Sequence, residues 1–142
     1  EVHRQIYLRR EDAGMIIHAH TKKAMAVSVR KIREVPCLVE EMSQLIGGGI
    51  PITPQYVPAE QHFQLGTTAA ENIGNRNGVI LRNHGPVAVG RNPEEAVLMV
   101  EVIEKACEIF LDQGQMFYAP IPQCYIDSER YRYLYKYGNE TT

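Results

Sequence analysis

Short apolar runs alternate along the chain with stretches in which apolar residues recur at helical spacing. Three runs have the length and composition of strands, namely residues 15–17 leading into 18–20, residues 79–84 and residues 87–89, and the last two are expected to form a hairpin across Gly85-Pro86. Helices are expected at residues 1–10, 21–30, 59–73, 92–112 and from 127 or 128 to 138. Because strands and helices alternate, the pattern predicts an α/β or α+β protein.

The strongest helix signal lies at residues 92–112. Asn92 can cap the first turn, Pro93 suits the first helical position, and Glu94 and Glu95 follow at the positive end of the helix dipole. Thr21 is expected to cap the helix at residues 21–30. One face of the long helix is expected to be buried and comprises Ala96, Val97, Val100, Ile103, Ala106, Cys107 and Phe110.

The composition excludes several classes of protein. The chain has 142 residues, a net charge of −2 and an isoelectric point near 6.2, whereas nucleic-acid-binding modules are usually basic. No apolar run approaches the ~18 residues that span a bilayer, so no membrane partner is expected. The three cysteines form no C-x-x-C pattern, which favours a reducing, cytoplasmic location. The chain begins at Glu1 without an initiator Met, and we expect the natural protein to start further upstream.

Histidines carry most of the chemical information. His18 and His20 follow a buried strand two residues apart, so both rings can point to one side of the strand. His84 also ends an apolar run, and three imidazoles with an open fourth position would make a catalytic zinc site. The alternative for His18 and His20 is that they are ordinary solvent-facing or hydrogen-bonded histidines. The alternative for His84 is a simple hairpin turn, because spacing alone does not show that His84 lies near the other two.

Several segments together resemble the class II aldolase/adducin family. They occur in the family's order over about residues 1–106 and comprise Tyr7, Arg10, Asp12-Ala13, Ile16-Ile17-His18-Ala19-His20-Thr21, Ile50-Pro51, Pro54, Leu81-Arg82-Asn83-His84-Gly85-Pro86, Gly90 and Glu94-Glu95-Ala96. The pairing of H-x-H with a later N-H-G is the most specific part of this pattern. The resemblance implies that His18, His20 and His84 bind one zinc ion, although another divalent metal is possible.

The same resemblance implies a fold and a set of activities. The fold is a three-layer α/β/α arrangement around a mainly antiparallel sheet, assembled as a homotetramer with active sites between subunits. The activity is zinc-dependent, aldolase-type cleavage of a ketose phosphate of the fuculose or rhamnulose phosphate kind, in which the metal stabilises an enediolate. Ribulose-phosphate 4-epimerase or methylthioribulose-phosphate dehydratase activity would use the same site. An adducin-like structural domain is the non-enzymatic alternative, in which the fold is kept and the metal ligands are lost.

The sequence departs from the family pattern at its beginning. The family's acid–base carboxylate precedes a histidine that matches His3, which puts the carboxylate upstream of Glu1. The loops that bind the substrate phosphate are expected upstream as well. Residues 1–142 are therefore expected to be one class II aldolase/adducin domain that is incomplete at its N-terminus and has little activity alone.

Two further positions are candidate catalytic residues. Glu40 stands where fuculose aldolases have a proton-donating Tyr, and its alternative is a surface acid beside Glu41. Tyr137 precedes Gly138 at the end of a Tyr-rich helix and matches a Tyr that closes the site of a neighbouring subunit. The alternative for Tyr137 is interface packing, because Tyr combines a large apolar area with a polar tip.

Overall fold

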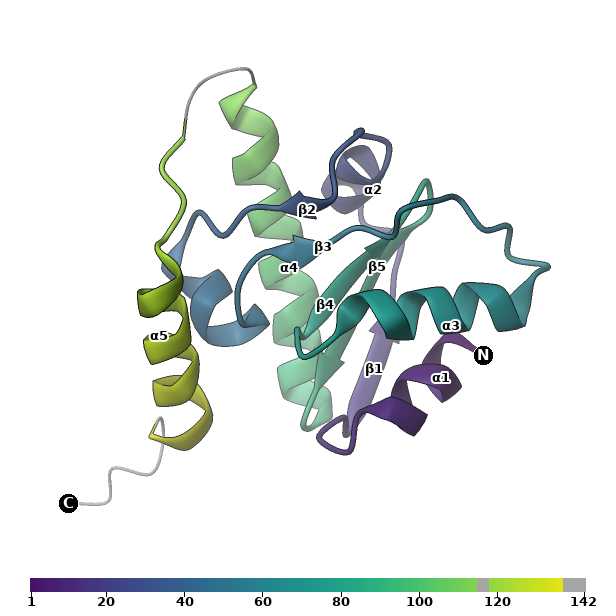
Figure 1. Ribbon diagram of the computed structural model, residues 1–142, viewed down its shortest axis with the longest axis horizontal. Helices are drawn as coiled ribbons and strands as arrows, with labels where there is room; N and C mark the ends of the chain where they lie inside the picture. Colours follow the sequence, from purple (N-terminus) through teal and green to yellow (C-terminus); the bar gives the residue numbers. More distant parts are fainter. Residues whose placement is uncertain (115–117, 137–142) are drawn as a thin grey trace.

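The computed structural model describes residues 1–114 and 118–136, and its centre is a sheet of three antiparallel strands in the order β1-β5-β4 (Figure 1). The strands are β1 (Met15–His18), β4 (Gly78–Leu81) and β5 (Gly85–Gly90). His18 pairs with Val87, and Leu81 pairs with Gly85. Because of this register, the end of β1 and the turn between β4 and β5 lie at the same edge of the sheet.

A smaller sheet extends this arrangement. It pairs β2 (Glu34–Val35) with β3 (Ile50–Pro51), and a parallel bridge between Ile52 and Ile80 joins the following residues to β4. The backbone N–H of Thr53 then donates to the carbonyl oxygen of Ile80 at 2.9 Å. This contact brings Thr53 close to the turn after β4.

Helices cover both faces of the central sheet, as Figure 1 shows. On one face, α1 (Val2–Arg9) and α3 (His62–Ile73) pack over Ile16, Val79, Leu81, Val87 and Val89. On the other, α2 (Lys22–Ser28) and α4 (Pro93–Gln113) pack over Ile80 and Ala88, and the π-helical η1 (Met42–Ile46) and α5 (Gln123–Tyr135) complete this layer. Every residue of β4 and β5 is buried, as expected of strands that are covered on both faces. The predicted three-layer fold with a mainly antiparallel sheet is therefore confirmed.

The predicted hairpin turn was misplaced. The expected strand at residues 79–84 ends at Leu81, residues 82–84 form the turn, and Gly85-Pro86 belong to β5. Asn83 adopts a left-handed conformation with φ of 58°, which asparagine tolerates better than most residues. The ring of His84 is thus presented by a turn. Likewise, β1 ends at His18, so His20 lies in the connection to α2.

The helix predictions were correct for α4 and less so elsewhere. The Asn92 side chain accepts the backbone N–H of Glu95 at 2.8 Å, and Pro93 begins the helix. Val97 is nevertheless 50% exposed, and Met99 and Val102 are buried in its place. The last helix begins at Gln123, four or five residues before the predicted start.

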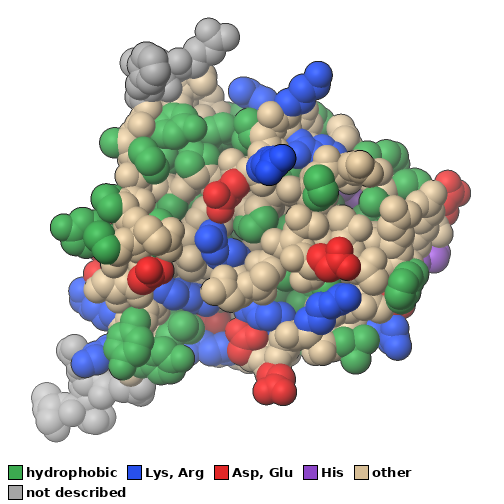
Figure 2. Space-filling view, viewed as in Figure 1, with side chains coloured by type: hydrophobic (Ala, Val, Ile, Leu, Met, Phe, Trp, Pro, Cys, Tyr) green, Lys and Arg blue, Asp and Glu red, His purple; other side chains and the backbone are tan. Residues whose placement is uncertain are grey.

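The molecular surface carries both signs of charge. On the face in Figure 2, Lys and Arg side chains are interspersed with Asp and Glu side chains, in keeping with the net charge of −2. Within residues 1–114 and 118–136, no helix combines the length and apolar character needed to cross a membrane.

Candidate metal centre

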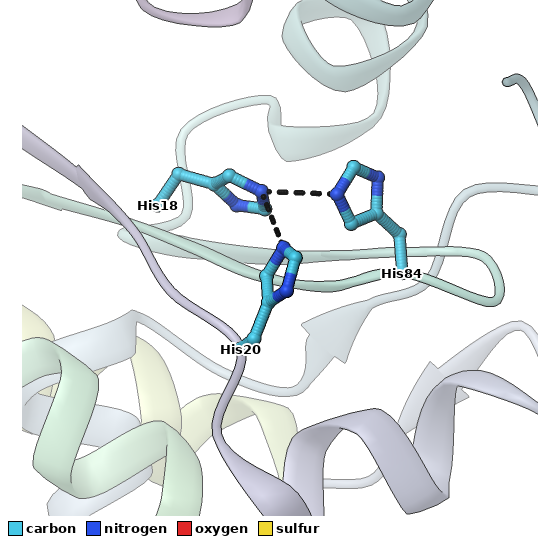
Figure 3. Close-up of side chains that lie close together, drawn as sticks. All are labelled: His18, His20 and His84. Carbon is cyan, nitrogen blue, oxygen red and sulfur yellow. Dashed lines mark hydrogen bonds between the residues drawn. The ribbon is translucent and has the colours of Figure 1, made fainter. Parts of the chain in front are cut away.

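Three imidazoles converge at the sheet edge where β1 ends and β4 turns into β5 (Figure 3). Nε2 of His18 lies 3.2 Å from Nε2 of His84 and 3.3 Å from Nε2 of His20. The ring centroids are 4.8 to 5.1 Å apart and the rings are steeply inclined to one another. The three ring nitrogens therefore face one shared point.

This spacing suits a tetrahedral metal ion. Zinc–imidazole bonds of about 2.0–2.1 Å imply nitrogen–nitrogen separations of roughly 3.3 Å around a tetrahedron. The two Nε2 separations, 3.2 and 3.3 Å, match that edge, and the potential ligand atoms of the group all lie within 4.8 Å of one another. Among the described residues the group consists of these three histidines, which leaves a fourth coordination position for another ligand.

Hydrogen bonding fixes the protonation pattern of His18. Its Nδ1 lies 2.9 Å from the carbonyl oxygen of Pro86, and a carbonyl oxygen can only accept, so Nδ1 carries the proton. In the neutral ring, the lone pair is then on Nε2, which points at the other two histidines. A backbone carbonyl that orients a ligating histidine in this way is typical of metal sites.

Partial burial lowers the pKa of His18 and of His84 and so favours their neutral forms. Desolvation lowers the pKa of His18, the bond to Pro86 opposes that shift, and the nearby charges of His20 and His3 add to it. Desolvation also lowers the pKa of His84, assisted by His18 and His20. Only the neutral form of imidazole has a lone pair for a metal, so a lowered pKa favours metal binding at neutral pH.

Arg82 anchors the turn that carries His84. Its Nε donates to the carbonyl oxygen of Thr53 at 3.0 Å, and Nη2 donates to the carbonyl oxygen of Ile32 at 2.7 Å. Nη1 donates to the carbonyl oxygen of Arg30, just beyond the end of α2. The Arg82 backbone N–H also donates to the Thr53 hydroxyl at 2.8 Å. One guanidinium therefore ties the His84 turn to two other segments.

Gly85 allows β5 to approach the segment between His18 and His20. A Cβ at residue 85 would lie 2.6 Å from the carbonyl oxygen of Ala19 and 3.4 Å from Cδ2 of His20. The backbone N–H of Ala19 donates to the carbonyl oxygen of Pro86 at 3.1 Å, which closes this contact. A side chain at residue 85 would therefore require β5 or the Ala19–His20 segment to shift.

Comparison with known proteins places this centre in a family. Residues 1–111 match the model of the Class II Aldolase and Adducin N-terminal domain. The chain belongs to this family. Family members are typically metal-dependent, in agreement with the three converging histidines.

Its relatives within the class II aldolase and adducin family include both aldolases and adducins. Rat alpha-adducin is 35% identical over 112 residues, which cover 76% of this chain and 14% of the adducin. The L-fuculose phosphate aldolase of Escherichia coli K12 is 27% identical over 109 residues, which cover 77% of this chain and 49% of the aldolase. The chain therefore spans half the length or less of these curated relatives.

Solved structures agree with the fold. An L-fuculose 1-phosphate aldolase superposes with a TM-score of 0.86 and 24% identity, over 94% of this chain and 62% of that one. The L-fuculose-1-phosphate aldolase of Thermus thermophilus gives a TM-score of 0.64 and 25% identity, over 78% of this chain and 58% of its own. The three-layer arrangement is thus that of a class II aldolase.

Among the described residues, Glu40 does not join the histidine group. Glu40 is exposed and precedes η1, while its neighbour Glu41 forms an ion pair with Lys105 at 2.8 Å. Tyr137 lies outside the described residues. His62 is exposed at the start of α3. A catalytic role for Glu40 or Tyr137 stays a prediction.

The sequence did not reveal the residues that support the histidines. Arg82, Gly85 and Pro86 were noticed only as parts of the family motif, and Thr53 was not singled out. Their roles depend on contacts across long sequence separations, such as the 29 residues between Thr53 and Arg82. The only available signal was that Arg82 and Gly85 flank Asn83-His84.

Proposed function

We propose that this chain is the metal-binding part of a zinc-dependent aldolase-type lyase that acts on a ketose phosphate. The observation that carries this proposal is the convergence of three imidazole nitrogens on one point, with the tautomer of His18 set by the carbonyl oxygen of Pro86. Membership of the class II aldolase and adducin family supports it. A homotetramer in the cytoplasm, with sites between subunits, belongs to the same proposal.

Zinc suits this donor set better than the alkaline-earth cations. Calcium and magnesium prefer oxygen ligands, whereas three neutral imidazoles with an open position are characteristic of catalytic zinc. Other first-row metals also bind imidazole, so the identity of the ion is part of the proposal. A bound zinc ion would supply Lewis-acid polarisation of substrate oxygens at the open position.

The chain's own residues have distinct proposed roles. His18, His20 and His84 hold the metal ion, and Arg82 keeps the His84 turn in place. Glu40 stands at the position of the proton-donating Tyr of fuculose aldolases and is proposed as the candidate catalytic residue there, which makes a substrate other than fuculose phosphate a part of the proposal. Tyr137 is proposed to donate a proton at a neighbouring subunit's centre, since a phenol with a pKa near 10 is protonated at neutral pH.

Other activities would use the same centre. Epimerisation of a ribulose phosphate or dehydration of a methylthioribulose phosphate needs the same metal and differs in the residues that move protons. An adducin-like structural role is favoured by one observation, the 35% identity to alpha-adducin compared with 27% to the aldolase. The three converging histidines favour the metal-dependent role.

An activity assay on the protein that contains this chain tests the proposal. Release of dihydroxyacetone phosphate from fuculose 1-phosphate and rhamnulose 1-phosphate would be followed with a coupled reductase. We expect cleavage that a chelator abolishes, that added zinc restores, and that His84→Ala abolishes. A protein that binds no zinc and cleaves neither substrate would support the structural role instead.

A further inference from the structure

Glu104, in the middle of α4, contacts the beginning of α2. Its Oε1 accepts the backbone N–H of Lys23, the second residue of α2. The two residues are 81 positions apart, so this bond ties a sheet-covering helix to the segment that leaves the metal centre. Lys23 follows the metal-centre residue His20 by three positions.

This bond replaces the usual cap of α2. Thr21 occupies the N-cap position, but its side chain makes no capping hydrogen bond. An N-cap hydroxyl ordinarily accepts the N–H of the second or third helical residue, and here Glu104 accepts that of Lys23 instead. The Thr21 hydroxyl therefore does not cap α2, although it lies at the same helix start that Glu104 contacts.

Two buried oxygen atoms lack partners at this place. They are Oγ1 of Thr21 and Oε2 of Glu104, the two such side-chain atoms found among the described residues. Buried polar atoms without partners cost stability, and they are uncommon unless the group has a further role. A hydroxyl can donate to a carboxylate oxygen, so the two atoms are chemically complementary.

The three histidines are held in different ways. His18 is in β1 and bonds to Pro86, and His84 is in a turn anchored by Arg82. His20 is exposed and lies beyond the end of β1. Two backbone hydrogen bonds hold the segment around His20. The N–H of Ala19 donates to the carbonyl oxygen of Pro86, and the N–H of Lys23 donates to Glu104.

We propose that Glu104 is a positioning residue for the metal centre, which it serves by fixing the His20–Lys23 segment through the Lys23 N–H. The proposal rests on the proposed metal centre. Glu104 does not contact the metal position, so it acts through the backbone that leads from His20 into α2. Groups that hydrogen-bond directly to metal ligands typically change metal affinity by 10–100-fold when they are removed, and we expect Glu104 to act at the low end of that range.

Two substitutions separate positioning from simple stability. Glu104→Met keeps the length of the side chain and removes both oxygens, and Glu104→Gln keeps an amide oxygen that can accept the Lys23 N–H. Glu108→Met is the matched control, since Glu108 is exposed one turn later on α4. Glu104→Met leaves the Lys23 N–H without its acceptor, so the unfolding free energy of each variant is measured beside its zinc affinity.

The experiment measures zinc affinity by competition with a chromophoric chelator, the cobalt-substituted absorption spectrum and the urea-unfolding free energy of the metal-free chain. We expect Glu104→Met to weaken zinc binding about ten-fold or more and to alter the cobalt spectrum, without a matching loss of stability. Glu104→Gln and Glu108→Met should stay within about three-fold of the unsubstituted chain. Unchanged zinc affinity in Glu104→Met, or lost affinity in Glu104→Gln, would overturn the proposal.

Amide hydrogen exchange at Lys23 in the metal-free chain gives a second, metal-independent test. Exchange should accelerate at least ten-fold in Glu104→Met and remain slow in Glu104→Gln. Equal exchange in all variants would overturn the positioning role even if zinc binds. Failure of the unsubstituted chain to bind zinc would instead overturn the metal centre, so the two proposals fail in different ways.

Discussion

The carbonyl oxygen of Pro86 lies 2.9 Å from Nδ1 of His18 and joins the sheet to the metal centre. The same oxygen accepts the backbone N–H of Ala19 at 3.1 Å. A single acceptor at the start of β5 therefore continues the pairing with β1 and sets the orientation of the His18 ring. The geometry of the centre consequently depends on how closely β5 approaches the residues that follow β1.

Gly85→Ala tests that dependence. The added Cβ would lie 2.6 Å from the carbonyl oxygen of Ala19, so the His18–His20 segment must shift. We expect zinc affinity to fall about ten-fold or more and stability to fall by about 1–3 kcal/mol, measured by chelator competition and urea unfolding.

Gly90→Ala is the matched control, because its Cβ would lie 2.4 Å from the backbone nitrogen of Ala96 at the far end of β5. It should destabilise the fold to a similar degree without changing zinc affinity. Equal losses of affinity in the two variants would show that Gly85 acts only through global stability.

Acid sensitivity should depend on Glu95. This buried carboxylate accepts hydrogen bonds from Arg91 and from the Tyr133 hydroxyl of α5, at 2.6 and 2.8 Å. Burial raises the pKa of Glu95, but these bonds outweigh it and the net pKa is below the ordinary 4.5. Because the folded-state pKa is depressed, the stabilisation is present above about pH 4.5 and is lost as the pH falls through the folded value.

Glu95→Gln should therefore lower the unfolding free energy by about 1–3 kcal/mol at pH 7, and the difference from the unsubstituted chain should shrink below pH 4.5. Urea unfolding between pH 7 and pH 3 measures this change. Glu94→Gln, at the exposed neighbouring position, is the control and should have little effect at any pH. A constant difference at every pH would mean that the charge of Glu95 is not what stabilises the contact with α5.

The sequence alone predicts secondary structure best where the signal comes from neighbouring residues. The Asn92 cap and Pro93 predicted the start of α4, because capping depends on residues adjacent in sequence. The turn at residues 82–84 was predicted two to three residues too late, since Gly85-Pro86 is a strong local turn signal. Contacts of Arg82 with Thr53 and Ile32, far away in the sequence, determine the actual turn.

The metal centre shows the same division. The proximity of His18 and His20 was predictable from their spacing, whereas the approach of His84 required the family resemblance. Similarly, the beginning of α5 depends on a backbone bond from Ile121 to Cys37 and on burial of Ile126, neither of which a local pattern contains. Roles for Arg82, Gly85 and Glu104 became visible only with the three-dimensional contacts.

The 142-residue chain by itself should be a very weak aldolase. None of its described carboxylates joins the three histidines, so it has the metal ligands without an adjacent acid–base group. Acid–base assistance is typically worth about 10²–10⁴-fold in rate. Cleavage of fuculose 1-phosphate by this chain at a rate near that of a complete class II aldolase would contradict the proposed division of roles.

Tyr137→Phe tests the proposed donor at the neighbouring subunit. In the protein that contains this chain, turnover should fall about ten-fold or more. Loss of one acid–base group typically costs about 10²–10⁴-fold, so ten-fold is a lower bound. Zinc content and assembly should not change. Tyr125→Phe, at a tyrosine of α5 that is 63% exposed, should keep normal turnover. Normal turnover in Tyr137→Phe would assign that side chain to packing.

Zinc stoichiometry is the most direct measurement of the central claim. The metal-free chain would be titrated with zinc and analysed by calorimetry and elemental analysis, together with single Ala variants of His18, His20 and His84. We predict one tightly bound zinc ion per chain, and a loss of at least ten-fold in affinity in each variant. Absence of zinc binding, or undiminished affinity in His84→Ala, would contradict a three-histidine metal centre.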